Sequence, residues 1–443
     1  MRRLNVMVAG VCWAALCGAP ASADTLRDAL FAMEQTNPQL ENQRQQMKIS
    51  EEQLTQAKGA RLPNVEVNSQ YGPQTIQTNR SLVLDQGGRQ IASTSLQATQ
   101  PLYAGGRINA GIRGARAGIG ESRAQLDAIR QDLYLNVITA YLDVRRDRET
   151  IRIRQSSVAL LTEQFQAAKD RFEVGEITRT DVALAEARFE SAKANLAAAE
   201  AQAEASIANY VFFVGRTPGE LAPPPAVKHI PSTFEQALSV AYERNPNIEA
   251  AVYGERVADQ DVKSARARLR PEVNIVASAS AQATLNQPAT PDIFGPDPTA
   301  LQTTPDFLDR NIQAFAQARI PLYQGGVARS QVRSAKLSRT QARLDVENMR
   351  RQTVAEVSQA WYAYKSSLVA IEANKRQAIA SQIAFEGGVE ELAVGVRTTL
   401  DVLDQEQDLL DARLSILVSE RNAYVAASQL LRAMGMLTQD IYR

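Results

Sequence analysis

Residue types that perform most enzyme chemistry are scarce in this chain of 443 residues. Its two cysteines, Cys12 and Cys17, both lie within the first 23 residues, and His229 is its only histidine. One histidine excludes a His-His metal site, and its place among prolines indicates a linker residue rather than the base of a Ser-His-Asp triad. The many carboxylates match no motif of a catalytic acid–base pair. The sequence therefore predicts no enzyme activity, no cofactor and no metal site.

Four closely spaced glycines could suggest a phosphate-binding loop: Gly111, Gly114, Gly118 and Gly120. Neither the GxxxxGK(S/T) pattern nor the GxGxxG spacing occurs there. We therefore expect these glycines to allow close packing of helices.

Two turn sequences carry the most informative polar residues. Residues 174–181 read Val-Gly-Glu-Ile-Thr-Arg-Thr-Asp, and residues 394–401 read Val-Gly-Val-Arg-Thr-Thr-Leu-Asp. A glycine with positive φ commonly ends one helix, and Thr and Asp commonly cap the next. Each stretch therefore predicts a tight helical hairpin.

An internal duplication places these two turns at equivalent positions. Thr25, Asn37, Pro38 and Pro63 recur 208 positions later as Thr233, Asn245, Pro246 and Pro271. From Pro101 onward the offset is 220, so the Pro-Leu-Tyr-x-Gly-Gly motif of 101–106 recurs at 321–326. We divide the chain into a leader (1–23), a first repeat (24–222), a proline-rich linker (223–232) and a second repeat (233–443).

The first 23 residues are typical of a secretory signal peptide. Arg2 and Arg3 precede a short apolar run, and an Ala-Ser-Ala cleavage site ends at Ala23. A lipoprotein would need Cys17 as its first mature residue, and the bulky Leu16 argues against that. Loss of the leader leaves no cysteine and a net charge of about −2, which excludes thiol chemistry and gives nucleic-acid binding no electrostatic support.

Each repeat changes its hydrophobic period twice. Side chains alternate at period two over 64–72 and 91–102, and again over 272–281 and 311–321. Runs of this length span a bilayer as tilted strands. The period then becomes seven until the turns at 174–180 and 394–399, so the first long helix, from about 107 to 173, would measure roughly 100 Å.

Four strands cannot close a barrel in lipid, because an open sheet edge leaves unpaired backbone groups. Identical chains arranged in a ring would supply the missing strands. Three chains give twelve strands, enough for an aqueous lumen, whereas the interior of an eight-stranded barrel is nearly filled. We therefore expect a cyclic oligomer, most simply a homotrimer.

The duplicated order of helix, two strands, long helix, turn and helix resembles the TolC family of outer-membrane exit ducts. The Pro-Leu-Tyr-x-Gly-Gly and Val-Gly turns support the resemblance, which extends from about Thr25 to Leu437. It implies a mainly α fold with a membrane β-barrel. The expected trimer has a twelve-stranded β-barrel in the outer membrane and a long coiled-coil α-barrel in the periplasm.

The resemblance also implies a gate at the periplasmic mouth. By position, Asp401 and Asp404 match the acidic constriction of the family, and Arg397, Thr180 and Asp181 match polar links that hold the closed state. Asp401 and Asp404 lie three residues apart and share one helical face, so three copies would place six carboxylates around one opening. The other interpretation of these residues is solvated acids at the start of a helix.

The Val-Gly pairs themselves resemble docking sites for the hairpin tips of periplasmic adaptors. These pairs are Val174-Gly175 and Val394-Gly395, where a small residue beside valine permits tip-to-tip contact. One position departs from the family pattern: Leu392 stands where the family has an aromatic gate residue.

We therefore expect an outer-membrane exit duct of a tripartite efflux pump or type I secretion system, conducting passively and gated at its periplasmic end. Its expected partners are two further copies, a periplasmic adaptor (membrane fusion protein), an inner-membrane ABC or proton-driven pump, and outer-membrane lipid, but no nucleic acid. The expected location is the outer membrane of a Gram-negative cell, with extension into the periplasm. The alternative is a periplasmic coiled-coil structural or adaptor protein without a membrane barrel. The sequence leaves the cargo open between drug, metal and secreted protein.

Overall fold

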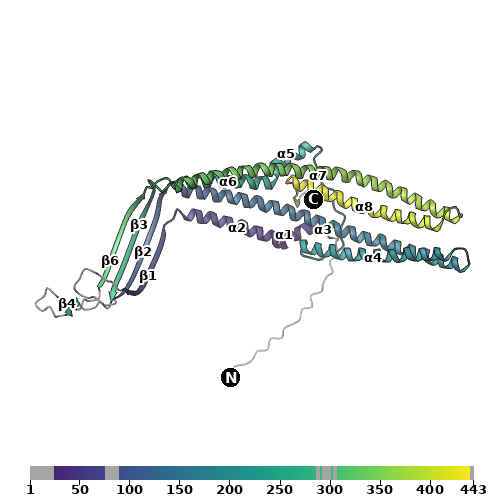
Figure 1. Cartoon of the computed structure of the whole chain (residues 1–443), viewed down its shortest axis with the longest axis horizontal. Helices are drawn as coiled ribbons and strands as arrows, with labels where there is room; N and C mark the ends of the chain where they lie inside the picture. Colours follow the sequence, from purple (N-terminus) through teal and green to yellow (C-terminus); the bar gives the residue numbers. More distant parts are fainter. Residues whose placement is uncertain (1–23, 75–88, 286–289, 292–300, 303–306, 440–443) are drawn as a thin grey trace, which may run out of the picture. The chain divides into compact units, whose positions relative to one another are not determined.

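The computed structural model describes residues 24–74, 89–285, 290–291, 301–302 and 307–439. The expected leader, 1–23, lies outside the described residues. The chain forms two compact units, each assembled from separate stretches of sequence (Figure 1). Unit 1 comprises Met1–Glu41, Ile129–Glu243 and Ala355–Arg443, and unit 2 comprises Asn42–Ala128 and Arg244–Val354.

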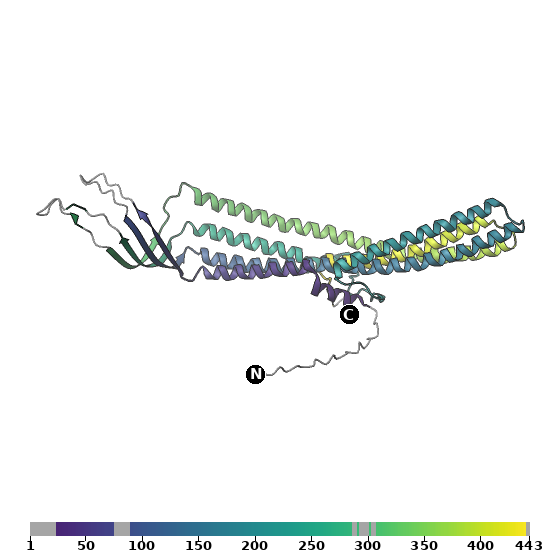
Figure 2. The ribbon, with the colours of Figure 1, turned by 90° about the horizontal axis from the view of Figure 1, so that it is seen from below.

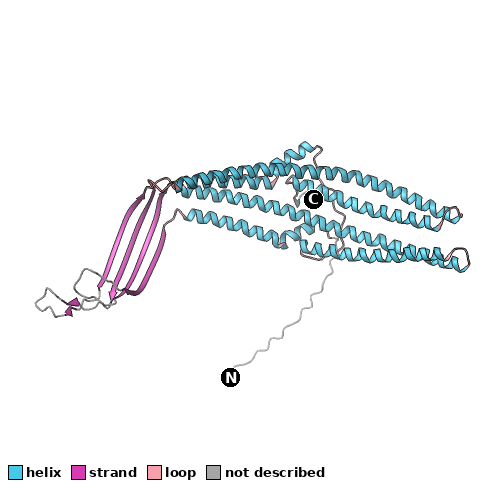
Figure 3. Cartoon of the chain, viewed as in Figure 1, coloured by secondary structure: helices cyan, strands magenta, loops and turns pink. Residues whose placement is uncertain are grey.

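Unit 1 is helical (Figure 3). Its helices are α1 (Leu26–Thr36), α4 (Arg179–Val214), α5 (Phe234–Arg244), α8 (Thr399–Ala433) and the C-terminal parts of α3 (Arg107–Glu173) and α7 (Val327–Ala393). The α3–α4 and α7–α8 hairpins lie side by side in two perpendicular views (Figures 1 and 2).

The core of unit 1 follows the expected heptad spacing. Val137, Val144, Val357 and Leu430 are at most 1 % exposed, because each lies on the stripe that faces the neighbouring helices. Polar side chains also cross this core: Arg432 of α8 contacts Asp132 of α3 at 2.7 Å and Glu356 of α7 at 3.0 Å. These ion pairs join three helices that are far apart in the sequence.

The segment just before the proline-rich linker is tied to the start of α1. The backbone N–H of Asp24 donates to the carbonyl of Glu220 at 2.7 Å, and the N–H of Ala222 donates to the carbonyl of Asp24 at 3.1 Å. The buried Tyr141 of α3 completes this anchor, since its hydroxyl donates to the carbonyls of Ala222 and Asp24 at 2.6 and 2.9 Å.

Unit 2 contains an antiparallel sheet and the helices that flank it. The strands are β1 (Asn64–Gln74), β2 (Arg89–Ala104), β3 (Glu272–Leu285) and β6 (Phe307–Arg319), hydrogen-bonded in the order β1-β2-β3-β6. A separate short pair joins β4 (Thr290–Pro291) to β5 (Leu301–Gln302). The helical part comprises α6 (Pro246–Ala267), most of α2 (Pro38–Gly59) and the N-terminal parts of α3 and α7.

The strand ends differ by a few residues from those expected. β1, β2 and β3 each extend past the expected ends at 72, 102 and 281. β6 begins at 307 and ends at Arg319, two residues before the expected end at 321. Pro321 has no N–H to donate to a neighbouring strand, so the ladder stops before it.

Close helix packing explains two of the four clustered glycines. A β-carbon at Gly120 would lie 2.4 Å from the ring of Tyr253, and one at Gly114 would lie 3.5 Å from a side chain of α6. No described atom outside their own helix lies within 4 Å of such a carbon at Gly111 or Gly118, so these two glycines make no close helix contact within one chain. In the described part of the chain, no helix is both long enough and apolar enough to cross a membrane.

Candidate functional site

The two hairpin turns, residues 174–178 and 394–398, have the same backbone geometry. Gly175 and Gly395 both adopt a φ of +79°, and in each turn the N–H of the next residue donates to the carbonyl five residues earlier at 2.9 Å. This bond satisfies a carbonyl at the end of the preceding helix. No described atom lies within 4 Å of a β-carbon built at either glycine, so the positive φ, and not crowding, requires glycine.

The residues after each glycine form a reciprocal helix cap. Thr178 accepts a hydrogen bond from the N–H of Asp181 at 3.3 Å, and the Asp181 carboxylate accepts one from the N–H of Thr178 at 2.9 Å. Thr398 and Asp401 make the same pair at 3.3 and 3.1 Å. The structure thus confirms that Thr and Asp cap α4 and α8.

These caps account for the electrostatics of both aspartates. Hydrogen bonds from the backbone and hydroxyl of Thr178 lower the pKa of Asp181 below its usual value. The pKa of Asp401 is lowered by the Thr398 hydroxyl first, then by the Thr398 backbone, with a smaller effect of the nearby Arg397 charge. Both carboxylates are therefore ionised at neutral pH and are occupied within their own helices.

Asp404 makes a contact of a different kind. Its Oδ1 accepts a hydrogen bond from Nη2 of Arg188 at 2.6 Å, which joins α8 to α4 across 216 positions of sequence. Both side chains are partly exposed, Arg188 at 37 % and Asp404 at 56 %. The two carboxylates expected to act together thus have separate partners within one chain.

Arg397 also has a partner that the sequence did not indicate. Its Nε lies 2.5 Å from Oε2 of Glu391, in the last turn of α7. Within a single chain, Arg397 is therefore paired with a carboxylate of α7 and not with Asp181. Thr180, the remaining residue of the expected links, is exposed at the start of α4.

The valines of both turns are among the most exposed apolar residues of unit 1. Val174 is 72 % exposed, Val394 75 % and Val396 74 %. Leu392, at the position where an aromatic residue was expected, is half-buried. Exposed valines at the tip of each hairpin leave an apolar surface available to a partner.

One buried acid near the turns was missed by sequence reasoning. Glu406 of α8 is 6 % exposed, and its Oε2 has no hydrogen-bond partner among the described residues. Burial raises its pKa, while hydrogen bonds from Gln164 and Ser157 of α3 act in the opposite direction. A cavity of about 30 Å³, large enough for one water molecule, lies beside Glu406 and is also lined by Arg188.

The sequence contains no spacing that could have indicated these contacts. Arg188 and Asp404 belong to different repeats. Glu406 lies between polar neighbours, in a stretch typical of a solvent-exposed helix face. Among the described residues, no group of three or more His, Cys, Asp and Glu side chains is placed to hold a metal ion.

Comparison with known proteins identifies the family. The family described as outer membrane efflux protein matches residues 31–215 and 237–436. The outer membrane efflux protein BepC of Brucella suis biovar 1 (strain 1330) is 31 % identical over 426 residues, which cover 96 % of this chain and 88 % of BepC. The outer membrane protein TolC of Escherichia coli (strain K12) is 23 % identical over 433 residues, covering 95 % of this chain and 84 % of TolC.

Solved structures show the same fold. The CmeC outer membrane channel of Campylobacter jejuni superposes with a TM-score of 0.77 at 14 % sequence identity, covering 98 % of this chain and 94 % of that chain. The expected TolC-like fold is thereby confirmed. The family match covers both repeats, and the similarity of the chain to BepC spans nearly the full length. The chain therefore belongs to the outer membrane efflux protein family.

Proposed function

We propose that three copies of this chain form an exit duct through the outer membrane of a Gram-negative cell, which conducts substrates passively. The observation that carries this proposal is the four-stranded sheet of unit 2. Within the described residues, β1 and β6 each pair on one side only. Unpaired N–H and C=O groups are costly in lipid, so each open edge needs a strand from another copy.

The composition of the strands fits this location. The four strands are 11 to 16 residues long, and about 9–11 residues cross the bilayer as a tilted strand. Val65, Val67 and Tyr71 alternate with polar residues along β1 and are 59–72 % exposed in the single chain. Ile312 of β6 is 85 % exposed. One face of each edge strand can therefore contact lipid while the other lines a water-filled lumen.

The gate would lie at the hairpin turns. Asp401, Asp404, Arg397, Thr180 and Asp181 are its proposed residues. In one chain, Asp404 joins α8 to α4 through Arg188, so moving the α7–α8 hairpin away from the α3–α4 hairpin must break this ion pair. For this reason we propose that Asp404 helps to hold the closed state. Three copies would place three such ion pairs around the opening.

The proposed partners follow from the turns and from the relatives. The exposed valines at Val174 and Val394, beside Gly175 and Gly395, would receive the hairpin tips of a periplasmic adaptor. The adaptor would connect the duct to an inner-membrane ABC or proton-driven pump that supplies the energy. Membership in a family of outer membrane efflux proteins supports this role over that of a periplasmic structural or adaptor protein.

Fractionation and conductance measurements test the proposal together. The protein is expected in the outer-membrane fraction, extractable only with detergent, with the native mass of a trimer and with ion conductance in planar bilayers. A monomer that leaves the periplasm without detergent and carries no current would refute the duct and favour the adaptor alternative.

A further inference from the structure

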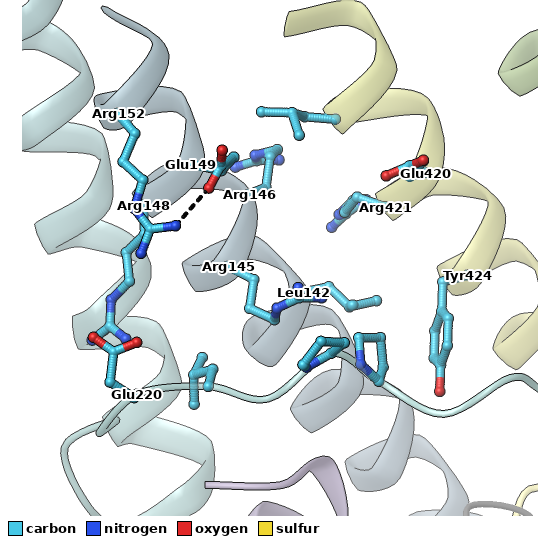
Figure 4. Close-up of a pocket in the computed structure, with 14 residues that line it drawn as sticks. Leu142, Arg145, Arg146, Arg148, Glu149, Arg152, Glu220, Glu420, Arg421 and Tyr424 are labelled. Carbon is cyan, nitrogen blue, oxygen red and sulfur yellow. Dashed lines mark hydrogen bonds and ion pairs between the residues drawn. The ribbon is translucent and has the colours of Figure 1, made fainter. Parts of the chain in front are cut away.

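A groove in unit 1 lies between α3, α8 and the proline-rich linker, away from the hairpin turns (Figure 4). It encloses about 680 Å³, within the roughly 300–1,000 Å³ typical of ligand sites. Five arginines line it. Arg146 of α3 and Arg421 of α8 are both paired with Asp143, and the other three, Arg145, Arg148 and Arg152 of α3, lie at helical spacing. Because these positions differ by three, four and seven residues, they occupy one face of the helix. We call this site the arginine groove.

Two of these last three guanidinium groups, those of Arg145 and Arg148, form no ion pair with a carboxylate of the described residues. Arg148 donates to the backbone carbonyls of Gly219 and Pro218 at 2.6 and 3.1 Å, which fixes its position but leaves its charge. Arg145 has no hydrogen bond or ion pair with the described residues, and it is half-buried. Arg152, the third arginine on this face, is paired with Glu149 at 2.9 Å. The groove thus presents two positioned, uncompensated cations.

The rest of the groove is apolar and acidic. Leu142, the linker residues Pro223 and Pro224, and the ring of Tyr424 line it, and the Tyr424 hydroxyl donates to a linker carbonyl at 3.0 Å. Figure 4 shows Glu220, just before the linker, on the side of α4 and Glu420 of α8 on the opposite side. An occupant must therefore bring both negative charge and apolar contact surface.

We infer that the arginine groove binds an acidic, extended polypeptide segment of another protein. Its carboxylates would contact Arg145 and Arg148, and its apolar side chains would pack on the prolines and Tyr424. Carboxylates form bidentate pairs with guanidinium groups, which gives geometric specificity as well as binding energy. This interaction goes beyond the proposed duct function, and its test does not depend on conduction.

The mixed lining favours a polypeptide over a simple anion. Inorganic phosphate would gain the two free guanidinium groups but none of the apolar surface, and Glu220 and Glu420 would repel it. A segment that alternates acidic and apolar residues can place its charges against α3 alone. The extended linker leaves one side of the groove irregular, which suits a chain without secondary structure better than a helix.

The test uses the full-length protein in detergent and a fluorescent, end-capped peptide of about ten residues that alternates glutamate with leucine and proline. Fluorescence anisotropy is expected to show saturable binding. Arg145→Gln should weaken it at least about fivefold, because a charge-assisted pair is lost. Arg376→Gln, which removes an exposed arginine of α7 outside the groove, should leave the affinity unchanged. Arg145 makes no hydrogen bond or ion pair with the described residues, so we expect its variant to fold, and the test stays valid even if Arg148→Gln fails to fold.

Four outcomes would overturn the inference. They are no saturable binding, equal binding by Arg145→Gln, equal binding of a peptide with lysine in place of glutamate, and displacement by an equimolar amount of inorganic phosphate. A competition experiment uses vesicles containing phosphatidylglycerol. If the vesicles displace the peptide, the inference is overturned and the groove is assigned to a lipid surface instead.

Discussion

Replacing Arg188 with Gln is expected to raise the open probability of the isolated duct. The substitution removes the ion pair between Arg188 and Asp404 but keeps a polar side chain of similar length. If this pair holds α8 against α4, its loss should destabilise the closed mouth without affecting the barrel.

The size of the effect follows from the geometry of the pair. The nitrogen–oxygen distance of 2.6 Å is short, but exposures of 37 % and 56 % allow strong solvent screening. Partly exposed pairs contribute about 0.2–1 kcal/mol each. Three copies would thus contribute about 0.6–3 kcal/mol, which corresponds to a change of roughly threefold to a hundredfold in the ratio of closed to open states.

Single-channel recording in planar bilayers measures this ratio directly. The difference from the unmodified protein should shrink from about 0.1 M to 1 M salt, because the screening length falls from about 10 Å to 3 Å. Lys193→Gln provides the matched control: it breaks an ion pair of similar exposure, with Glu190, that lies within α4 and does not reach α8. Unchanged gating of Arg188→Gln at low salt, or fully additive effects of Arg188→Gln and Asp404→Asn, would refute the reasoning.

Three further predictions follow. Burial raises the pKa of Glu406 above its ordinary value of 4.5, so between these two pKa values the folded chain keeps a proton that the unfolded chain loses. The free energy of unfolding therefore falls as the pH rises from 4.5 through the raised pKa. Glu406→Gln should abolish this decline in melting temperature against pH, whereas the exposed Glu390→Gln should retain it. Arg397→Gln removes an ion pair at the end of α7 and should raise the conductance of the isolated protein in planar bilayers; unchanged conductance would count against a role in closure. Tyr141→Phe removes the hydroxyl contacts of α3 with the carbonyls of Asp24 and Ala222 and should lower the unfolding free energy by about 1 kcal/mol, seen as a lower melting temperature by circular dichroism.

The sequence predicted well what depends on local pattern. The expected first long helix, 107–173, coincides with α3 because its heptad repeat runs without interruption between a Gly-Gly turn and a Val-Gly turn. The caps at Thr178 and Thr398 were likewise predictable, since a capping box involves residues only three positions apart.

Contacts between the hairpins could not be predicted from the sequence. Glu406 and its neighbours Gln407 and Asp408 are all polar, and only the packing of α8 against α3 makes Glu406 buried. The partner of Asp404 depends in the same way on how α8 and α4 lie together. Side-chain pairing of this kind is set by tertiary packing, which no local spacing encodes.

The duplication separates residues that build the turn from residues that can regulate it. Asp181 and Asp401 are equivalent and form equivalent caps, so each has a structural role in addition to its proposed place at the gate. Asp404, by contrast, corresponds to Leu184 of the first repeat, and only the second repeat can form the ion pair with α4.

Asp181→Asn and Asp401→Asn are therefore expected to weaken their helix starts similarly, whereas Asp404→Asn should have the largest effect of the three on closure. Melting curves and bilayer recordings of the three variants measure these two effects separately. Should Asp401→Asn shift open probability and cation preference as much as Asp404→Asn does, while Asp181→Asn shifts neither, the cap would not be the main role of Asp401. The two acids would then act as one constriction, and the division between structural and regulatory residues drawn from the repeats would fail.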